Sequence, residues 1–508
     1  MKLKLVSILL VCLMASSAFA TNTWVGPSGS WGNGALWGSG LPDGSTAQGD
    51  LKICKNNVTS CDLDVAAGTF NNGKVILGGN SSYNIAFNIK TGGSITIGTE
   101  FRIGDSGVGG QGPYGKAIQT GGSVVMINTG KLEIGYKVNG RGIYTISGGT
   151  ISSTGGMAVG SSVGKSGGES GGIGTFTIQG NGPSISVGSL YVGTGDPTGF
   201  YTGTGTLEFQ IVNGTVTAIQ AGNVYIDPIN ASASVANLTV SITSGTPAGD
   251  IILVNNTGNN PVYGAFDNAA WDSTVTVGTT NYILTKVYNA STGSHTGGND
   301  IALIPTSITT SMPATNTGDL LIAAVTTDGS TTISTPSGWT PINQGSDDGG
   351  QVTLGAWYKV AVASEPAPIF NWTGVRQAYG WIMRFSGQAA SNPINTSNSG
   401  QSFGTATPSS PPVTTTVKNC LILRLGAFDD NSITINNPTL LSGHTTITAD
   451  ASGGVAGGIV SGGAGYIKQA AIGSSGNSNF SLLSAKAARM LTIAIAPANT
   501  DSADEIKP

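Results

Sequence analysis

The chain has 508 residues, of which only 9% are charged, and its formal net charge is −4 at pH 7. A mildly acidic chain without clustered Lys and Arg is not expected to bind nucleic acid, which requires basic patches. The 39% of hydrophobic residues and the mean hydropathy of +0.11 exclude a wholly disordered chain, so we expect hydrophobic cores.

The first 20 residues have the three parts of a secretory signal peptide. Lys2 and Lys4 give a positive start, residues 5–14 form an apolar run that is too short to span a bilayer, and Ala18 and Ala20 fit a cleavage site. We therefore expect a mature chain that begins at Thr21 and lies outside a bacterial cell, secreted or at its surface. No other run approaches the roughly 18 apolar residues of a membrane span.

Residues 21–70 are expected to cap the first repeat. Cys54 and Cys61 lie close together in the sequence CKNNVTSC, and an oxidising compartment would join them in a disulfide. Cys420, in the apolar run at 420–425, is instead expected to be a free and buried thiol. The side chains that would cover the first repeat are Trp24, Trp31 and Trp37.

Residues 71–304 contain a short repeated pattern. The motif apolar-x-apolar-Gly occurs as FRIG at 101–104, LEIG at 132–135, MAVG at 157–160 and LYVG at 190–193. Between these motifs, short strands run into glycine pairs, as in AIQTGG at 117–122 and YTISGG at 144–149. Alternation turns every second side chain inward, and Gly permits the positive φ of a tight corner. Such coils must stack to bury their apolar faces, which predicts a right-handed parallel β-helix. The irregular period leaves a β-sandwich or propeller as the alternative.

A resemblance to a known family appears at the start of this region. The sequence TWVGPSGSWGNGALW at 23–37, followed by GLPDG at 40–44, resembles secreted bacterial passenger-like proteins of the autotransporter-associated β-strand repeat type. The resemblance implies a Gly-rich β-helix and covers about residues 21–304. Segments 264–266, 275–278, 282–284 and 299–303 are similar to the closing segment of such passengers. A translocator barrel, a sorting motif and an anchor helix are not recognised, so self-transport is not expected.

The composition changes after residue 304. Residues 304–313 are typical of a linker, and residues 305–498 predict a β-sandwich or jelly-roll-like domain. The motifs GDLLIAAV at 318–325 and TPSGWT at 335–340 resemble a widespread bacterial extracellular module without an assigned activity. The polar tail at 499–508 is expected to be disordered. Strands are expected at 320–325, 353–360, 369–372, 381–385, 420–425 and 490–496.

The residues that could carry chemistry are few. Glu133 and Glu208 lie at outward-facing strand positions, where solvated carboxylates are expected more often than a catalytic pair. No cofactor or metal is expected, because the two histidines, His295 and His444, lie far apart. Two pairs of adjacent loop acids could still share a calcium ion, which favours several oxygen ligands. These pairs are Asp347 with Asp348 and Asp429 with Asp430.

Trp271 and Trp339 are predicted to lie in loops, where an exposed indole could stack on a sugar ring. We therefore expect a non-enzymatic structural or adhesion protein, with a solenoid stalk and a separately folding β-sandwich head. Its expected partners are extracellular glycans, cell-surface components or matrix components. The alternatives are a polysaccharide lyase or hydrolase on a β-helix and a non-catalytic carbohydrate-binding protein. Three or more acidic and basic residues clustered on one solenoid face would favour the enzyme. Aromatic residues lining a groove on the head would favour glycan binding.

Overall fold

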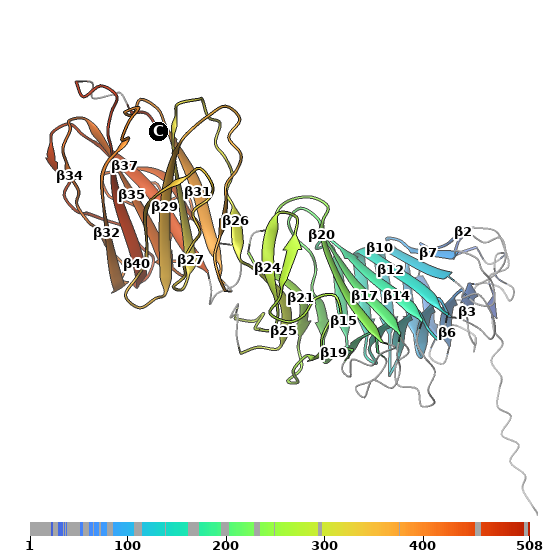
Figure 1. Cartoon of the computed structure of the whole chain (residues 1–508). Helices are drawn as coiled ribbons and strands as arrows, with labels where there is room; N and C mark the ends of the chain where they lie inside the picture. The colour runs from blue at the N-terminus through green and yellow to red at the C-terminus, as the bar shows by residue number, and fades with distance from the viewer. Residues whose placement is uncertain are drawn as a thin grey trace, which may run out of the picture.

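All regular elements that the computed structural model describes are β-strands, as expected (Figure 1). No described helix is long and apolar enough to cross a membrane. The signal-peptide segment 1–20, Trp24 and Cys54 lie outside the described residues. The structure describes residues 22–23, 29–33, 35, 37, 51–53, 60–64, 66–70, 73–78, 85–105, 114–137, 139–160, 172–194, 203–227, 234–247, 249–292, 297–374, 376–452, 459–501 and 506–508.

The N-terminal half is a β-solenoid. One face is a nine-stranded sheet in which all neighbouring strands are parallel. Its strands, in spatial order, are β1 (Asn22–Thr23), β3 (Leu51–Ile53), β6 (Lys74–Leu77), β9 (Glu100–Ile103), β11 (Lys131–Ile134), β13 (Met157–Val159), β16 (Leu190–Val192), β19 (Val224–Ile226) and β22 (Tyr263–Gly264).

Two further parallel faces complete each coil. The long strands β10 (Tyr114–Met126) and β12 (Arg141–Ser153) bend at a corner, so their first and second halves belong to different faces. The first of these faces also contains β2 (Gly29–Ser30), β4 (Ser60–Leu63), β7 (Ile85–Ile89), β14 (Ile173–Gln179), β17 (Thr204–Ile211) and β20 (Val235–Ile242). The second also contains β5 (Ala66–Phe70), β8 (Ser94–Ile97), β15 (Pro183–Val187), β18 (Ile219–Ala221) and β21 (Ile251–Asn256).

The repeated motif explains the stacking. Its first apolar positions, Phe101, Leu132, Met157 and Leu190, are directly in register on adjacent strands, and all four are fully buried. Burial of each side chain of this size contributes roughly 1.5 to 3 kcal/mol. The predicted apolar ladder of a solenoid is therefore confirmed.

Glycine is required where the coil turns. Gly122, at the corner inside β10, has φ +67°, and a Cβ there would lie 2.2 Å from the carbonyl oxygen of Gly93 in the preceding coil. Gly135, which ends the LEIG motif, has φ +77°, and its Cβ would lie 2.4 Å from the carbonyl oxygen of Ile173. Both the backbone conformation and the close approach of the neighbouring coil exclude a larger residue.

The first coil is covered by tryptophans, but the predicted disulfide is not found. Trp31 and Trp37 are buried with ring centroids 4.7 Å apart, and Trp31 also contacts Phe87. Cys61 is a free thiol, because alternation in β4 turns it into the core in register with Phe87 rather than toward a loop. Burial raises the pKa of this thiol, and the charges of Asp62 and Asp64 add to the effect. Cys420 is free and buried, as expected.

The C-terminal end of the solenoid changes from parallel to antiparallel pairing. β25 (Asp300–Pro305) pairs antiparallel with β21, then with β24 (Thr280–Tyr288), which pairs with β23 (Thr274–Val277). Side chains cover the edge of β20. The amide of Asn268 accepts from Leu238 N at 2.9 Å and donates to Leu238 O at 2.8 Å, and Asp267 accepts from Ala236 N at 2.6 Å.

The C-terminal half contains two larger antiparallel sheets that share one hydrophobic cluster. The four-stranded sheet has the order β28 (Thr340–Ser346), β29 (Val352–Val360), β27 (Leu320–Asp328) and β31 (Ala378–Phe385). The five-stranded sheet has the order β32 (Ile394–Thr405), β40 (Lys486–Ile495), β35 (Cys420–Asp429), β37 (Val460–Gln469) and β36 (Thr445–Ala451). The short pairs are β26 (Ser307–Thr309) with β30 (Ile369–Asn371), β33 (Ser409–Ser410) with β39 (Ser478–Asn479), and β34 (Thr414–Thr415) with β38 (Gly473–Ser474).

Two segments differ from the sequence prediction. The expected linker at 304–313 holds the end of β25 and all of β26, because β26 finds a pairing partner in β30. In the tail, for which the sequence predicts disorder, Ile506 is only 3% exposed and joins the shared cluster. Lys507 and Ser386 exchange two backbone hydrogen bonds beside it. The side chain of Ile506 therefore packs the last residues of the tail against the sheets.

Candidate functional site

The two tryptophans singled out for sugar stacking belong to hydrophobic clusters. Trp339 is 7% exposed and packs against Phe370 with ring centroids 6.4 Å apart. Trp271 is half-buried against Phe266, and its Nε1 donates to the carbonyl oxygen of Gly264 at 2.7 Å. The indole of Trp339 therefore presents no free face to a ligand, whereas that of Trp271 stays half-buried.

The four loop acids are bound to the chain itself. Asp347 accepts from the backbone nitrogens of Gly349, Gln351 and Val352, which holds the turn between β28 and β29. Asp348 accepts from the side-chain amide of Gln401. Asp430 accepts from the ammonium of Lys486 and from the backbone nitrogen of Asn431. Burial raises the pKa of Asp429, opposed by Lys486. Among the described residues, no three His, Cys, Asp or Glu side chains form a group that could hold a metal ion.

One face of the solenoid carries a compact charge cluster. Arg102, on β9, forms ion pairs with Glu133 at 3.1 Å, with Asp105 at 3.2 Å and with Glu100. Glu133 occupies the outward position that we expected, but it is fully buried rather than solvated. Burial alone would lower the pKa of Arg102, but Glu133, Glu100 and Asp105 raise it. Arg102 therefore binds carboxylates of two adjacent coils, through Glu100 of β9 and Glu133 of β11.

Further along the same outward row, aromatic rings replace the charges. Tyr191, Tyr225 and Tyr263 are neighbours in register, with successive ring centroids 5.0 and 5.2 Å apart and planes within 8° of parallel. Glu208, on the adjacent face, accepts from Thr177 and Gln210. The middle ring of the three tyrosines, that of Tyr225, has both faces covered by its neighbours, so it cannot also stack on a sugar.

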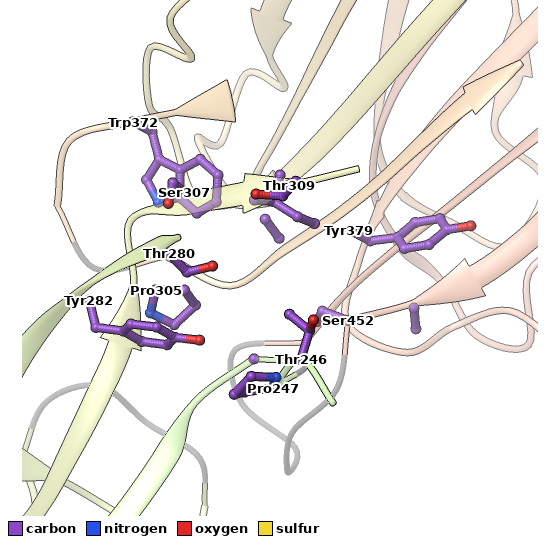
Figure 2. Close-up of a pocket in the computed structure, with 14 residues that line it drawn as sticks. Thr246, Pro247, Thr280, Tyr282, Pro305, Ser307, Thr309, Trp372, Tyr379 and Ser452 are labelled. Atoms are coloured by element: carbon purple, nitrogen blue, oxygen red, sulfur yellow. The ribbon is translucent and has the colours of Figure 1, made fainter. Parts of the chain in front are cut away.

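A recess lies where the solenoid meets the C-terminal half (Figure 2). We call it the junction recess; its volume is about 250 Å³. It is formed by the antiparallel end of the solenoid, by β26 and by two segments of the sheets beyond it. The residues that line it are Thr246, Pro247, Gly249, Thr280, Tyr282, Pro305, Ser307, Ile308, Thr309, Trp372, Ala378, Tyr379, Ala451 and Ser452.

The walls of the junction recess combine aromatic rings with hydroxyl groups. Figure 2 shows the rings of Trp372, Tyr282 and Tyr379 around hydroxyl side chains such as that of Ser307. Burial, together with the charge of Asp250, raises the pKa of Tyr282 to about 12, so this phenol stays neutral. None of the described residues that line the recess is an Asp, Glu, Lys, Arg or His.

A hydrogen-bond network behind the recess joins the two halves of the chain. Gln377, which is fully buried, donates to Asp250 at 3.1 Å and accepts from the hydroxyl of Ser452 at 2.8 Å. Asp250 also bonds the phenol of Tyr288, whose pKa is raised by burial and by this carboxylate. Asp250 belongs to the solenoid, while Gln377 and Ser452 belong to the C-terminal half. The network therefore fixes the walls of the recess relative to each other.

Sequence analysis did not find this site. Its lining comes from six separate segments, and none of them carries a recognisable motif. The available signal was weak: Trp372 ends a predicted strand, and Tyr282 lies in the predicted closing segment. Comparison of the chain with protein-family models, with curated proteins and with solved structures found no match.

Proposed function

We propose that this chain is a secreted or cell-surface structural and adhesion protein, in which the solenoid is a stalk and the C-terminal half is a head. The observation that carries the proposal is the continuity of the apolar ladder into an antiparallel end that is hydrogen-bonded to the head through Gln377 and Asp250. Stacked coils give a stiff body, because each coil buries its apolar face only against its neighbours. A stiff stalk holds a head away from the surface that bears it.

We propose in addition that the head is a β-sandwich and that the solenoid winds to the right. Two antiparallel sheets over one shared cluster support a β-sandwich for the head. A right-handed winding of the solenoid follows from the strong preference of parallel crossover connections. The solenoid is compatible with a bacterial passenger, and the signal-peptide pattern of residues 1–20 supports export. Extracellular glycans or matrix components are the partners that such a head would contact.

A polysaccharide-active enzyme is the second candidate, because Arg102 and its carboxylates form the charge cluster that this alternative requires on one solenoid face. Two observations favour the scaffold. The Glu133 carboxylate is fully buried, and the Arg102 guanidinium is held by three carboxylates at once. A general acid or base must reach the proton that it transfers. The cluster is better suited to joining β9 and β11.

Both candidates can be tested on one preparation. Beads coated with the full mature chain should be retained on immobilised extracellular polysaccharide and on bacterial surfaces, and no soluble oligosaccharide or unsaturated uronate should be released. The Glu133→Gln variant should unfold more easily because it weakens the pairing with Arg102, yet bead retention below its unfolding temperature should equal that of the parent.

Two outcomes would contradict the proposal. Release of oligosaccharide that stops in Glu133→Gln would favour the enzyme. Absence of retention on every surface would remove the adhesion role.

A further inference from the structure

We propose that the junction recess binds one neutral sugar ring, either free or at the end of a glycan. This site does not require the proposed adhesive role, because a free sugar could occupy it in a protein that adheres to nothing. Drug-sized ligands use pockets of about 300 to 1,000 Å³, so a recess of about 250 Å³ suits a single ring.

The polarity of the walls favours a neutral and hydroxylated ligand. Thr280 and Ser307 contribute hydroxyls that can donate as well as accept, and the hydroxyl of Ser452, whose hydrogen is donated to Gln377, can accept, which matches the mixed needs of sugar hydroxyls. No described lining residue carries a charge that could neutralise an ionic ligand. The carboxylate of Asp250, whose charge raises the pKa of Tyr282, further disfavours an anionic sugar.

The indole of Trp372 supplies the second observation. Trp372 is only 6% exposed, and its Nε1 has no hydrogen-bond partner among the described residues. In Figure 2 this nitrogen lies on the side of the ring that faces Ser307 in the recess. A buried donor without an acceptor is costly, and a ligand oxygen that reached this nitrogen would remove that cost.

Other indoles of the chain give a comparison. Trp271 donates to the carbonyl oxygen of Gly264, and Trp357 donates to the hydroxyl of Thr335 at 3.0 Å. Trp381 also lacks a partner for Nε1 among the described residues, but it does not line the recess. The need for an acceptor also argues against a quaternary ammonium ion, which would otherwise suit a group of aromatic rings.

Saturation-transfer NMR on the full mature chain tests the proposal. The neutral probes are the methyl glycosides of glucose, galactose and N-acetylglucosamine at millimolar concentrations, and the charged probes are glucuronate and tetramethylammonium. We expect transfer to at least one neutral glycoside and none to either ion. A trisaccharide that ends in the best-binding sugar separates the two sources: tighter binding than the monosaccharide indicates a glycan end, and equal or weaker binding indicates a free sugar.

Variants locate the binding. Trp372→Phe keeps an aromatic ring but removes the donor, and it should weaken binding about tenfold, as expected for one net hydrogen bond. Ala378→Leu fills the recess and should abolish the signal. Trp339→Phe is the matched control, because Trp339 is equally buried in the same half but does not line the recess. Its affinity should equal that of the parent, and unfolding temperatures identify any variant that fails to fold.

The proposal is overturned if no neutral glycoside gives transfer, or if tetramethylammonium or glucuronate binds instead. It is also overturned if folded Trp372→Phe and Ala378→Leu bind as tightly as Trp339→Phe, since the sugar would then occupy another site. Retention of the coated beads without any binding to the recess would leave the adhesion role standing, so the two proposals fail separately.

Discussion

Arg424 donates its Nε hydrogen to Nε2 of His444 over 3.1 Å. The guanidinium is buried and also donates to the carbonyl oxygens of Pro411 and Gly476. Because a guanidinium can only donate, Nε2 of His444 must carry a lone pair. The ring proton therefore sits on Nδ1, which is 2.9 Å from the carbonyl oxygen of Ser442. The imidazole of His444 is thus held neutral between an arginine and a carbonyl.

This arrangement predicts a pH-dependent stability. Burial lowers the pKa of His444, and Arg424 lowers it further against the opposing effect of the Ser442 carbonyl. The unfolded chain therefore binds a proton more readily, and the free energy of unfolding should fall as pH decreases below about 6.5. His444→Gln, whose amide oxygen can accept from Arg424, should flatten this dependence. Urea unfolding from pH 7 down to about pH 5 measures the free energy of unfolding of the parent and of His444→Gln. If it falls equally in both proteins, His444 does not cause the pH dependence.

A second prediction concerns the apolar ladder. Leu132 is fully buried in register between Phe101 and Met157, so Leu132→Ala should lower the free energy of unfolding by about 2 to 5 kcal/mol. Thr239→Ala, at an exposed position of β20, is the control and should change it by less than about 0.5 kcal/mol. Chemical denaturation compares the two. Equal effects of both changes would mean that the ladder does not stabilise the solenoid.

A third prediction separates two reasons why a position requires glycine, namely a positive φ and the close approach of a neighbouring coil. Gly404 has φ +72°, and a Cβ added there would meet no heavy atom within 4 Å. Gly404→Ala therefore tests the backbone conformation alone and should cost about 1 to 2 kcal/mol. Gly135 has a similar φ of +77° but also faces Ile173 of the next coil. Gly135→Ala should therefore cost about 1 to 3 kcal/mol more than the control. Equal losses in thermal or urea unfolding would show that the coil contact is unimportant.

A fourth prediction concerns the two buried thiols. Burial raises the pKa of Cys61, and it raises the pKa of Cys420 to about 11, so few thiolates exist at neutral pH. Iodoacetamide should leave both residues unmodified in the native chain and label both after unfolding in urea without reductant. Peptide mapping by mass spectrometry gives the result. Recovery of Cys61 bridged to Cys54 would restore the disulfide that the sequence suggested.

The parts of the fold that could be predicted from the sequence depend on local repetition. The FRIG and LEIG motifs each place two apolar side chains inward and end at a glycine, and such a unit can bury its side chains only by stacking. The motif therefore predicts both the ladder of Leu132 and the left-handed conformation of Gly135. The pairing of Arg102 with Glu133 was not predicted, because it depends on the register between coils and not on either residue alone.

The candidate site depends on contacts over longer stretches of the chain. Trp339 follows a turn signal that suggests an exposed loop, but Phe370, from a distant segment, buries it. Trp372 is buried, as its apolar strand predicts, yet the recess beside it forms only when the solenoid end meets β26. The sequence pairs Cys61 with its nearest cysteine, whereas the alternation of β4 decides which way its side chain points. A tertiary contact therefore overrides the local pattern at Trp339, and the recess beside Trp372 is formed by contacts that no local pattern indicates.

The side chains of Asp267 and Asn268 determine what can happen beyond β20. An unpaired strand edge is a template on which another chain can add a strand, as in amyloid growth. Here the amide of Asn268 and the carboxylate of Asp267 already occupy backbone groups of Leu238 and Ala236 that an incoming strand would need. Strand addition at these positions of β20 is therefore blocked by side chains of the same chain, which protects this edge from the pairing between copies that starts a fibre.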